Sequence, residues 1–204
     1  MTKRLNSKHK VDRRLKVNLW GRPKSPFNTR AYPPGQHGQT KSSKPSDYGI
    51  QLQAKQKLKC YYGNMNERQF RNMYKRAIMK KGDTAENLIG LLERRLDAVI
   101  YRAKFVATMF AARQFVNHGH ILVNGKRVDI PSYNTKPGDQ IAVRDNPRSK
   151  QLALRGLDLT QGISQPEWLV VDRDNLEGTI SRVPERDEVD PMVNEQLVVE
   201  LYSR

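Results

Sequence analysis

The chain has 204 residues and a formal net charge of +16, from 37 Lys and Arg against 21 Asp and Glu. This length allows one large domain or two small ones. The positive charge indicates a polyanionic partner. No stretch of the sequence approaches the roughly 18 apolar residues of a spanning helix, and the N-terminus lacks the apolar segment of a signal peptide, so we expect no membrane partner.

Cysteine usage agrees with a reducing compartment, because the single Cys60 cannot form an intramolecular bridge. A catalytic thiol is the alternative. We disfavour it because the surrounding Lys59-Cys60-Tyr61-Tyr62 contains no histidine that would activate the sulfur.

The charge is distributed unevenly along the chain. Residues 1–81 carry a balance of +18, residues 82–155 a balance of +5 and residues 156–204 a balance of −7. We therefore expect the first two-fifths of the chain to meet the polyanion. The acidic end is expected to face solvent or a basic protein.

Residues 1–45 form a basic arm rich in Pro, Gly and Ser, which we expect to be extended and largely disordered when free. Trp20, Phe27 and Tyr32 are its apolar anchors. Two interpretations remain open for these rings, since they would either stack on bases or pack on a neighbour. A solvated tail with no partner is the third alternative.

A helical module is predicted over residues 46–93. Its first helix begins at Ser46 and stops at Gly63. Its second runs from Glu67 to Lys81 behind Asn66 as N-cap, and one face carries Phe70, Met73, Tyr74, Ala77 and Ile78. The opposite face carries Arg68, Arg71 and Lys75, which we interpret as phosphate ligands rather than an ordinary solvated stripe.

A third helix is indicated by Asp83 and Glu86, which are spaced like a capping box. Its apolar stripe would continue without interruption through the following residues: Leu88, Ile89, Leu92, Leu96, Val99 and Ile100. We interpret this stripe as core.

The next stretch, residues 94–155, predicts a small α+β domain. Thr108 would cap a helix over Met109–Asn117 that presents Arg113 and Asn117 outward, and Gly119 would end it. Asn124-Gly125 predicts a tight type I′ hairpin turn, because both residues tolerate positive φ. Further along, Pro137-Gly138-Asp139 is a turn signal and Gln140–Arg144 a strand signal.

Several short motifs of this stretch follow a characteristic order: Arg95-Leu96-Asp97, Tyr101-Arg102, Ala112-Arg113-Gln114, Gly119-His120-Ile121-Leu122-Val123-Asn124-Gly125 and Pro137-Gly138-Asp139. The order resembles the small RNA-binding domain named after the fourth protein of the small ribosomal subunit. Similar domains occur in pseudouridine synthases, tyrosyl-tRNA synthetases and a heat-shock protein, so the domain by itself indicates only RNA binding.

Motifs outside the domain extend the resemblance nearly end to end. They are similar to parts of the bacterial ribosomal protein family itself: Pro34-Gly35-Gln36-His37-Gly38, Leu52-Gln53-Ala54-Lys55-Gln56-Lys57, Tyr61-Tyr62-Gly63, Glu67-Arg68-Gln69-Phe70-Arg71 and Val199-Glu200-Leu201-Tyr202-Ser203-Arg204. Only 49 residues follow Arg155, without an obvious set of acid, base and nucleophile, so we expect no enzyme.

The resemblance implies a primary binder of small-subunit ribosomal RNA that docks at a junction in the 5′ domain and nucleates assembly of the subunit body. It also implies contact with ribosomal protein five, a place where messenger RNA enters, and an influence on translational accuracy. The implied RNA contacts are the polar positions in or beside the motifs: Arg68, Arg71, Lys75, Arg102, Lys104, Arg113, Asn117, His118, His120, Asn124 and Lys126.

Some members of the family hold zinc through four cysteines in the arm, whereas here only His9 and His37 stand in that region. Tetrahedral zinc needs about four ligands, so we predict no metal site and no cofactor. We interpret His118-Gly119-His120 as neutral donors to RNA, because no carboxylate or cysteine cluster surrounds them.

The sequence thus predicts an α+β protein. It would consist of a basic extended arm (1–45), a helical module (46–93), a small domain of two helices on a short antiparallel sheet (94–155), and an acidic segment (156–204) whose short strands return to the helical module. We expect it in the cytoplasm as part of the small ribosomal subunit, with an organellar ribosome as the alternative. A free-standing RNA chaperone and an RNA-modifying enzyme are the rival functions.

Overall fold

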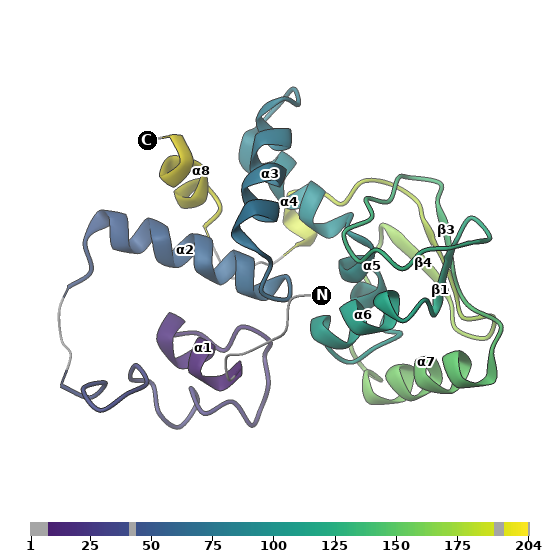
Figure 1. Ribbon diagram of the computed structural model, residues 1–204, viewed down its shortest axis with the longest axis horizontal. Coiled ribbons are helices and arrows are strands. Elements are labelled where there is room, and N and C mark those ends of the chain that lie inside the picture. The colour runs from purple at the N-terminus through teal and green to yellow at the C-terminus, as the bar shows by residue number, and fades with distance from the viewer. Residues whose placement is uncertain (1–7, 41–43, 190–193, 204) are drawn as a thin grey trace. The chain divides into compact units, whose positions relative to one another are not determined.

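A computed structural model describes residues 8–40, 44–189 and 194–203, which divide into two compact units (Figure 1). The first unit joins the chain up to Tyr74 with the described C-terminal residues, and the second is Lys75–Val189. The mixture of helices with a five-stranded antiparallel sheet confirms the predicted α+β class.

The first unit is helical, with α1 (Lys8–Leu15), α2 (Asp47–Tyr61), most of α3 (Glu67–Ile78) and α8 (Gln196–Ser203). The predicted signals for α2 are confirmed at both ends, because the Ser46 hydroxyl accepts a hydrogen bond from the Gly49 N–H and Gly63 has a φ of 75°. Asn66 caps α3 as predicted, and its side-chain oxygen accepts from the Arg68 N–H at 3.1 Å.

The end of α3 differs from the prediction. The helix stops at Ile78 rather than Lys81, where the Lys80 N–H bonds to the Ala77 carbonyl in a tightened turn. Ile78 was wrongly expected to face inward. Its exposed fraction is 54%, because the buried face ends at Ala77.

Helix α1 lies inside the basic arm and was not predicted. Its Val11 and Leu15 form a buried cluster with Leu19 and Cys60. Trp20 packs against this cluster, and its indole N–H donates to the Tyr61 carbonyl. The arm is therefore anchored on α2 by apolar contacts that the Lys-rich composition obscures.

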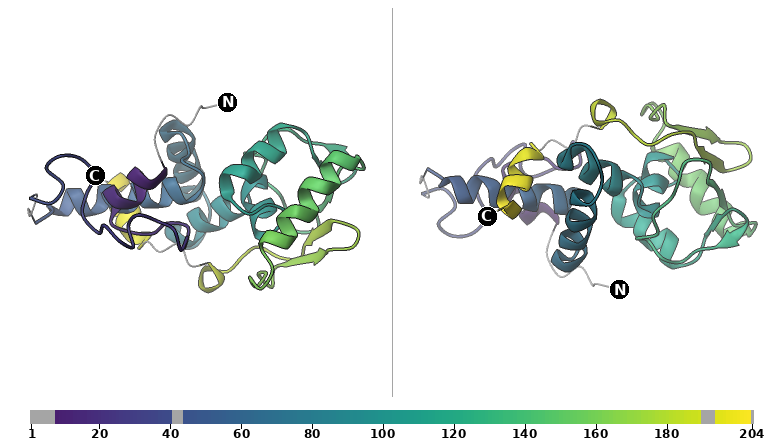
Figure 2. Two further views of the ribbon diagram at one scale, coloured as in Figure 1. Left: turned by 90° about the horizontal axis from the view of Figure 1, so that it is seen from below. Right: turned by 90° about the horizontal axis from the view of Figure 1, so that it is seen from above.

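The C-terminal helix α8 packs against α2, as the two views of Figure 2 show. Its Tyr202 ring stacks on Tyr74 at 4.6 Å between ring centroids and lies 6.2 Å from Phe70. Residues far apart in the sequence thus complete one aromatic cluster within the first unit.

The second unit contains α4 (Thr84–Glu93), α5 (Leu96–Arg102), α6 (Met109–Asn117) and α7 (Pro147–Leu159), followed by the short 3-10 helix η1 (Arg186–Glu188). Its strands are β1 (Ile121–Val123), β2 (Lys126–Arg127), β3 (Gln140–Val143), β4 (Leu169–Asp172) and β5 (Glu177–Ile180), in the order β2-β1-β3-β5-β4. Buried side chains of α5, α6 and α7 form one core with residues of the sheet.

The third predicted helix is divided into α4 and α5, so its uninterrupted course was wrong. Asp83 does cap α4, but Arg95 is extended, with a ψ of 138°. The break allows the N–H groups of Leu96 and Asp97 to bond the carbonyls of Tyr133 and Pro131. Hydrogen bonds to this loop thus replace the intrahelical bonds that a continuous helix would make.

The predicted hairpin is confirmed. Asn124 and Gly125 have φ values of 49° and 75°, as a type I′ turn requires, and Val123 pairs with Lys126 across it. Thr108 caps α6 by accepting from the Ala111 N–H, and Gly119 ends the helix with a φ of 70°.

The strands of the acidic segment do not return to the helical module. Instead β5 pairs with β3, and β4 with β5, so both strands extend the sheet of the second unit. Leu169 and Ile180 are buried in its core together with Trp168. The parts of the segment that pack with the helical module are η1, against α4, and α8, against α2.

Candidate nucleic-acid interface

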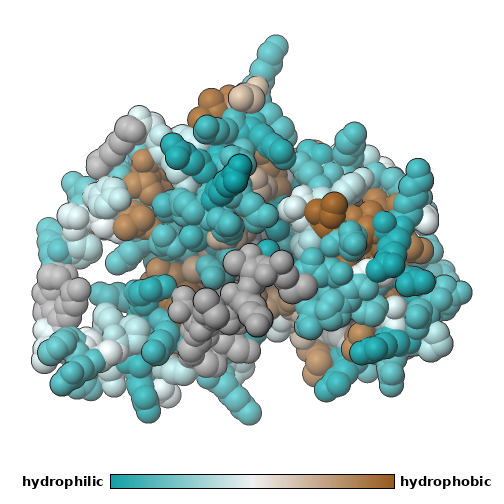
Figure 3. Space-filling model, viewed as in Figure 1, coloured by the Kyte–Doolittle hydropathy of each residue, from teal (hydrophilic) through white to brown (hydrophobic). Residues whose placement is uncertain are grey.

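The basic stripe on α3 lies open to solvent as predicted. Arg68, Arg71 and Lys75 are all exposed, and their side chains make no hydrogen bond or ion pair with a residue that the structure describes. On the face shown in Figure 3, hydrophilic residues cover most of the surface of each unit. The α3 stripe is therefore free to meet phosphates.

Arg102 is already engaged within the protein. Its guanidinium donates two hydrogen bonds to the Glu93 carboxylate, at 2.9 and 2.7 Å, and Glu93 is fully buried. Bidentate pairs of this kind are strong and directional. Arg102 thus neutralises a buried charge, a contact that sequence spacing does not reveal.

Lys104 and Arg113 are also partly enclosed. Lys104 is 8% exposed and lies 5.7 Å from the centre of the Tyr101 ring. Burial lowers the pKa of Lys104, and nearby Arg102 lowers it further. The half-buried Arg113 lies close enough to Asp97 for its charge to act on that carboxylate.

The Arg95-Leu96-Asp97 motif forms a buried ion pair at the start of α5. Both side chains of the Arg95–Asp97 pair are almost completely buried, and their two hydrogen bonds measure 2.9 and 2.6 Å. Burial raises the pKa of Asp97, whereas Arg95 and Arg113 act against the shift. The motif therefore fixes the start of α5.

At the hairpin, the Asn124 side chain stabilises the turn through two hydrogen bonds. Its amide donates to Asp139 and its oxygen accepts from the Gln140 N–H, both at 2.9 Å. The neighbouring Lys126 is exposed on β2 and makes no ion pair with a described residue. Lys126 and Arg127 are thus both exposed cations of the hairpin.

His118 and His120 lie side by side, with ring centres 6.1 Å apart. Nδ1 of His120 lies 2.8 Å from the Ser149 hydroxyl, and its ring stacks on Phe115. Burial lowers the pKa of His120, and the charges of His118 and three arginines add to the shift; these arginines are Arg148, Arg144 and Arg127. The neutral form of His120 is thus favoured, inside a cluster of cations.

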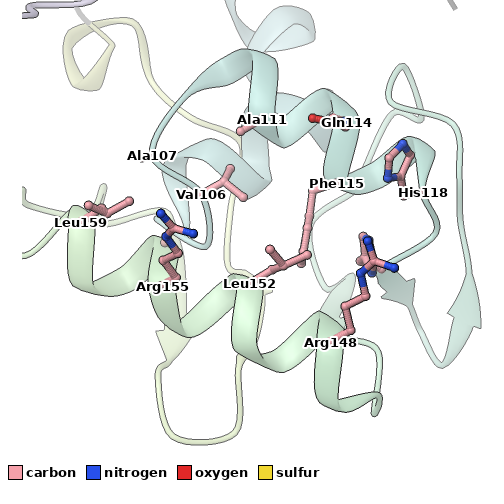
Figure 4. Close-up of a pocket in the computed structure, with 12 residues that line it drawn as sticks. Val106, Ala107, Ala111, Gln114, Phe115, His118, Arg148, Leu152, Arg155 and Leu159 are labelled. Carbon is pink, nitrogen blue, oxygen red and sulfur yellow. The ribbon is translucent and has the colours of Figure 1, made fainter.

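A groove of about 400 Å³ runs between α6 and α7 beside these histidines (Figure 4). His118 and Gln114 line it from the α6 side, and Arg148, Leu152 and Arg155 from α7. Neither the groove nor α7 was predicted from the sequence. The cue in the sequence is Asn146-Pro147, an N-cap followed by proline at the first helical position.

Among the described residues, no three His, Cys, Asp or Glu side chains gather as metal ligands. None of the helices in the described ranges is long and apolar enough to cross a membrane.

Two family models together match residues 3–141. "Ribosomal protein S4/S9 N-terminal domain" matches residues 3–93, and "S4 domain" matches residues 94–141. A protein of Pelagibacter ubique named "Small ribosomal subunit protein uS4" is 62% identical over 207 residues, with both chains covered completely. The chain belongs to the uS4 family.

Other uS4 proteins give the same result. Those of Granulibacter bethesdensis and Phenylobacterium zucineum are 62% and 57% identical, and each alignment covers all of both chains. The S4-domain match ends at residue 141, so β4, β5 and α7 of this uS4 chain lie beyond it.

Proposed function

We propose that the chain is a non-enzymatic structural constituent of the small ribosomal subunit and that it binds small-subunit ribosomal RNA. Full-length identity of 62% with a protein named for that subunit carries the proposal. The charge balance of +18 over residues 1–81 and the exposed cations of α3 support it.

The finer role follows from the family resemblance. We propose that the protein docks on a helical junction in the 5′ domain of the RNA and nucleates assembly of the subunit body. We further propose that it lines the site where messenger RNA enters, contacts ribosomal protein five and thereby influences accuracy. The cytoplasm is the proposed location.

The expected RNA contacts fall into groups according to the exposure of each side chain and the contacts that it makes within the protein. We propose direct contact with RNA for the exposed or partly exposed positions to which we assign no structural role within the protein: Arg68, Arg71, Lys75, Asn117, His118 and Lys126. Arg102 and Asn124 shape the surface through Glu93 and Asp139. Lys104, Arg113 and His120 contribute charge or polarity from partly enclosed positions.

We also propose that the functional parts are the arm (1–45), the helical module (46–93), the small domain (94–155) and the acidic segment (156–204). In this division the basic parts contact RNA. The acidic segment carries α8, which supports the helical module through α2.

Sedimentation of cell extracts on a sucrose gradient tests the main proposal. The tagged full-length protein should migrate with small subunits at moderate salt. The variant Arg68→Gln/Arg71→Gln should shift partly to the top of the gradient, whereas Arg173→Gln, on an exposed turn, should not. If the wild-type protein stays at the top, a free-standing RNA chaperone or regulator becomes the better assignment.

A further inference from the structure

The groove between α6 and α7 has an apolar interior and a cationic rim. One side of α7 presents a stripe in which basic and apolar side chains alternate, at positions 148, 152, 155 and 159: Arg148, Leu152, Arg155 and Leu159. The opposite wall comes from α6 and the segment before it, with Val106, Ala111 and Phe115. Figure 4 shows Leu152 and Phe115 extending toward each other across the groove.

Helix α7 makes a close backbone contact at one end of the groove, at Gly156. A Cβ atom at Gly156 would lie 2.0 Å from the Phe105 carbonyl oxygen, so the glycine lets the helix backbone touch this segment. The Thr160 hydroxyl donates to the Gly156 carbonyl at 2.9 Å. The same hydroxyl also lies 3.3 Å from the Lys104 carbonyl oxygen, which joins the end of α7 to the segment before α6.

The rim carries only positive or neutral polar groups. Neither Asp nor Glu lines the groove, and the side chains of Arg148 and Arg155 have no hydrogen-bonding or ion-pair partner among the described residues. Leu152 and Leu159 remain 41% and 65% exposed. Exposed apolar groups between unpaired cations suit a ligand that is flat and apolar in one part and anionic in another.

We propose that this groove is a subsite for one nucleotide of single-stranded RNA. The base enters the apolar part between Leu152 and Phe115, while Arg148 and Arg155 bind the flanking phosphates. Proteins that bind single strands combine apolar or aromatic platforms for bases with cations for the backbone in this way. The inference rests on the proposed RNA-binding function and adds a site whose α7 wall lies outside the S4-domain match, which ends at residue 141.

The size of the groove favours a nucleotide over an acidic protein helix. Its volume of about 400 Å³ falls in the range of roughly 300–1,000 Å³ that small ligands occupy. A stable protein interface buries about 800 Å² on each partner, whereas the large exposed apolar side chains in the groove are confined to Leu152 and Leu159. The cationic cluster around His120 continues the rim toward further phosphates.

A pair of leucines on α7 provides a matched test. Leu152 lines the groove, whereas Leu154 is 50% exposed on the same helix and does not. Leu152→Ser and Leu154→Ser remove the same apolar area from the same helix without changing charge. We expect Leu152→Ser to weaken binding to a 5′-domain RNA fragment about tenfold, and Leu154→Ser to leave it unchanged.

The cationic part is tested by Arg155→Gln against Arg173→Gln, which remove one positive charge each from the second unit. Arg155→Gln should reduce the slope of log affinity against log salt by about 0.7, the value for one phosphate of a single strand. Arg173→Gln should leave the slope unchanged. Circular dichroism checks that all four variants are folded.

The outcomes separate the two proposals. If the wild-type chain does not bind the RNA fragment, the proposed function itself fails. If the wild-type chain binds and Leu152→Ser binds equally well, the function stands and the nucleotide subsite is refuted. Retained RNA affinity together with loss of an acidic protein partner would likewise refute the subsite and assign the groove to that protein.

Discussion

Single basic residues in this protein differ chiefly in whether a carboxylate has already engaged them. Arg102 forms an ion pair with the buried Glu93, while Lys126 in the same unit has no ion pair with a described residue. Both belong to motifs that resemble the same family, and both were expected at the RNA. A stability measurement separates their roles.

We predict that Arg102→Ala lowers the free energy of unfolding by about 3 kcal/mol, because Glu93 would keep a buried charge without its principal partner. Urea denaturation followed by tryptophan fluorescence measures this, since Trp168 lies in the core of the same unit. Lys126→Ala is the control. It should change the unfolding free energy by less than about 0.5 kcal/mol. An equal effect of both variants would contradict the structural role that distinguishes Arg102 from Lys126.

Local backbone chemistry at single residues was predictable from the sequence. Ser46, Asp83 and Thr108 all cap helices as expected, because each cap depends on atoms within three or four residues. The interactions of Arg102 and Arg113 with carboxylates of the protein were not predictable. Their carboxylate neighbours lie 9 and 16 positions away in the sequence, on other elements of the fold.

At the scale of elements, one carboxylate connects α8 with both α2 and α3. Glu67 at the start of α3 accepts hydrogen bonds from Lys55 at 2.8 Å, Lys59 at 3.1 Å and the Tyr202 hydroxyl at 2.8 Å. Burial opposes the charge of Glu67, but these three donors outweigh it and lower its pKa to about 2. The network thus joins α2, α3 and α8.

This pKa predicts how the stability of the first unit depends on pH. A carboxylate with a folded pKa of about 2 and an ordinary value of 4.5 stabilises the fold fully above pH 4.5. The stabilisation is lost as the pH falls from 4.5 toward 2. Glu67→Gln should therefore be less stable than the wild type at pH 7, and the difference should shrink across that interval.

Thermal unfolding at several pH values measures the effect. Tyr202→Phe retains the carboxylate and removes one of its three donors, so its pH dependence should lie between those of the wild type and Glu67→Gln. A constant difference between Glu67→Gln and the wild type from pH 7 to pH 2 would show that the ionisation of Glu67 does not contribute to stability.

Elements with strong local signals were predictable, and those that depend on distant packing were not. Helix α2 and the β1–β2 hairpin follow from caps and an Asn-Gly turn. Helix α1 is stabilised by contact of Val11 and Leu15 with Cys60, far along the chain. The break between α4 and α5 likewise depends on residues 131–135, which the apolar periodicity of the helix does not reveal.

For the whole molecule, the segregation of charge along the chain is the property that governs RNA association. The balance of +18 over residues 1–81 stands against −7 over residues 156–204. This broad pattern was readable from composition. The pairing of β4 and β5 with β3 was not, because it places acidic-segment strands in the sheet of the second unit.

We predict strongly salt-dependent RNA binding. Neutralising several phosphates releases condensed counterions, so affinity for a 5′-domain fragment should fall at least about a hundredfold from roughly 50 to 200 mM salt. Filter binding over a salt series measures the slope. An affinity that stays constant over this range would remove electrostatics as the basis of recognition.

The position of α8 sets an order of events during synthesis. Lys75–Val189 is one continuous stretch, so the second unit is complete before α8 is translated. The first unit begins earlier but receives Tyr202, the partner of Phe70 and Tyr74, only with the final helix. Domains generally fold as units during translation. The first unit therefore begins to be synthesised before the second unit but receives its last aromatic partner after the second unit is complete.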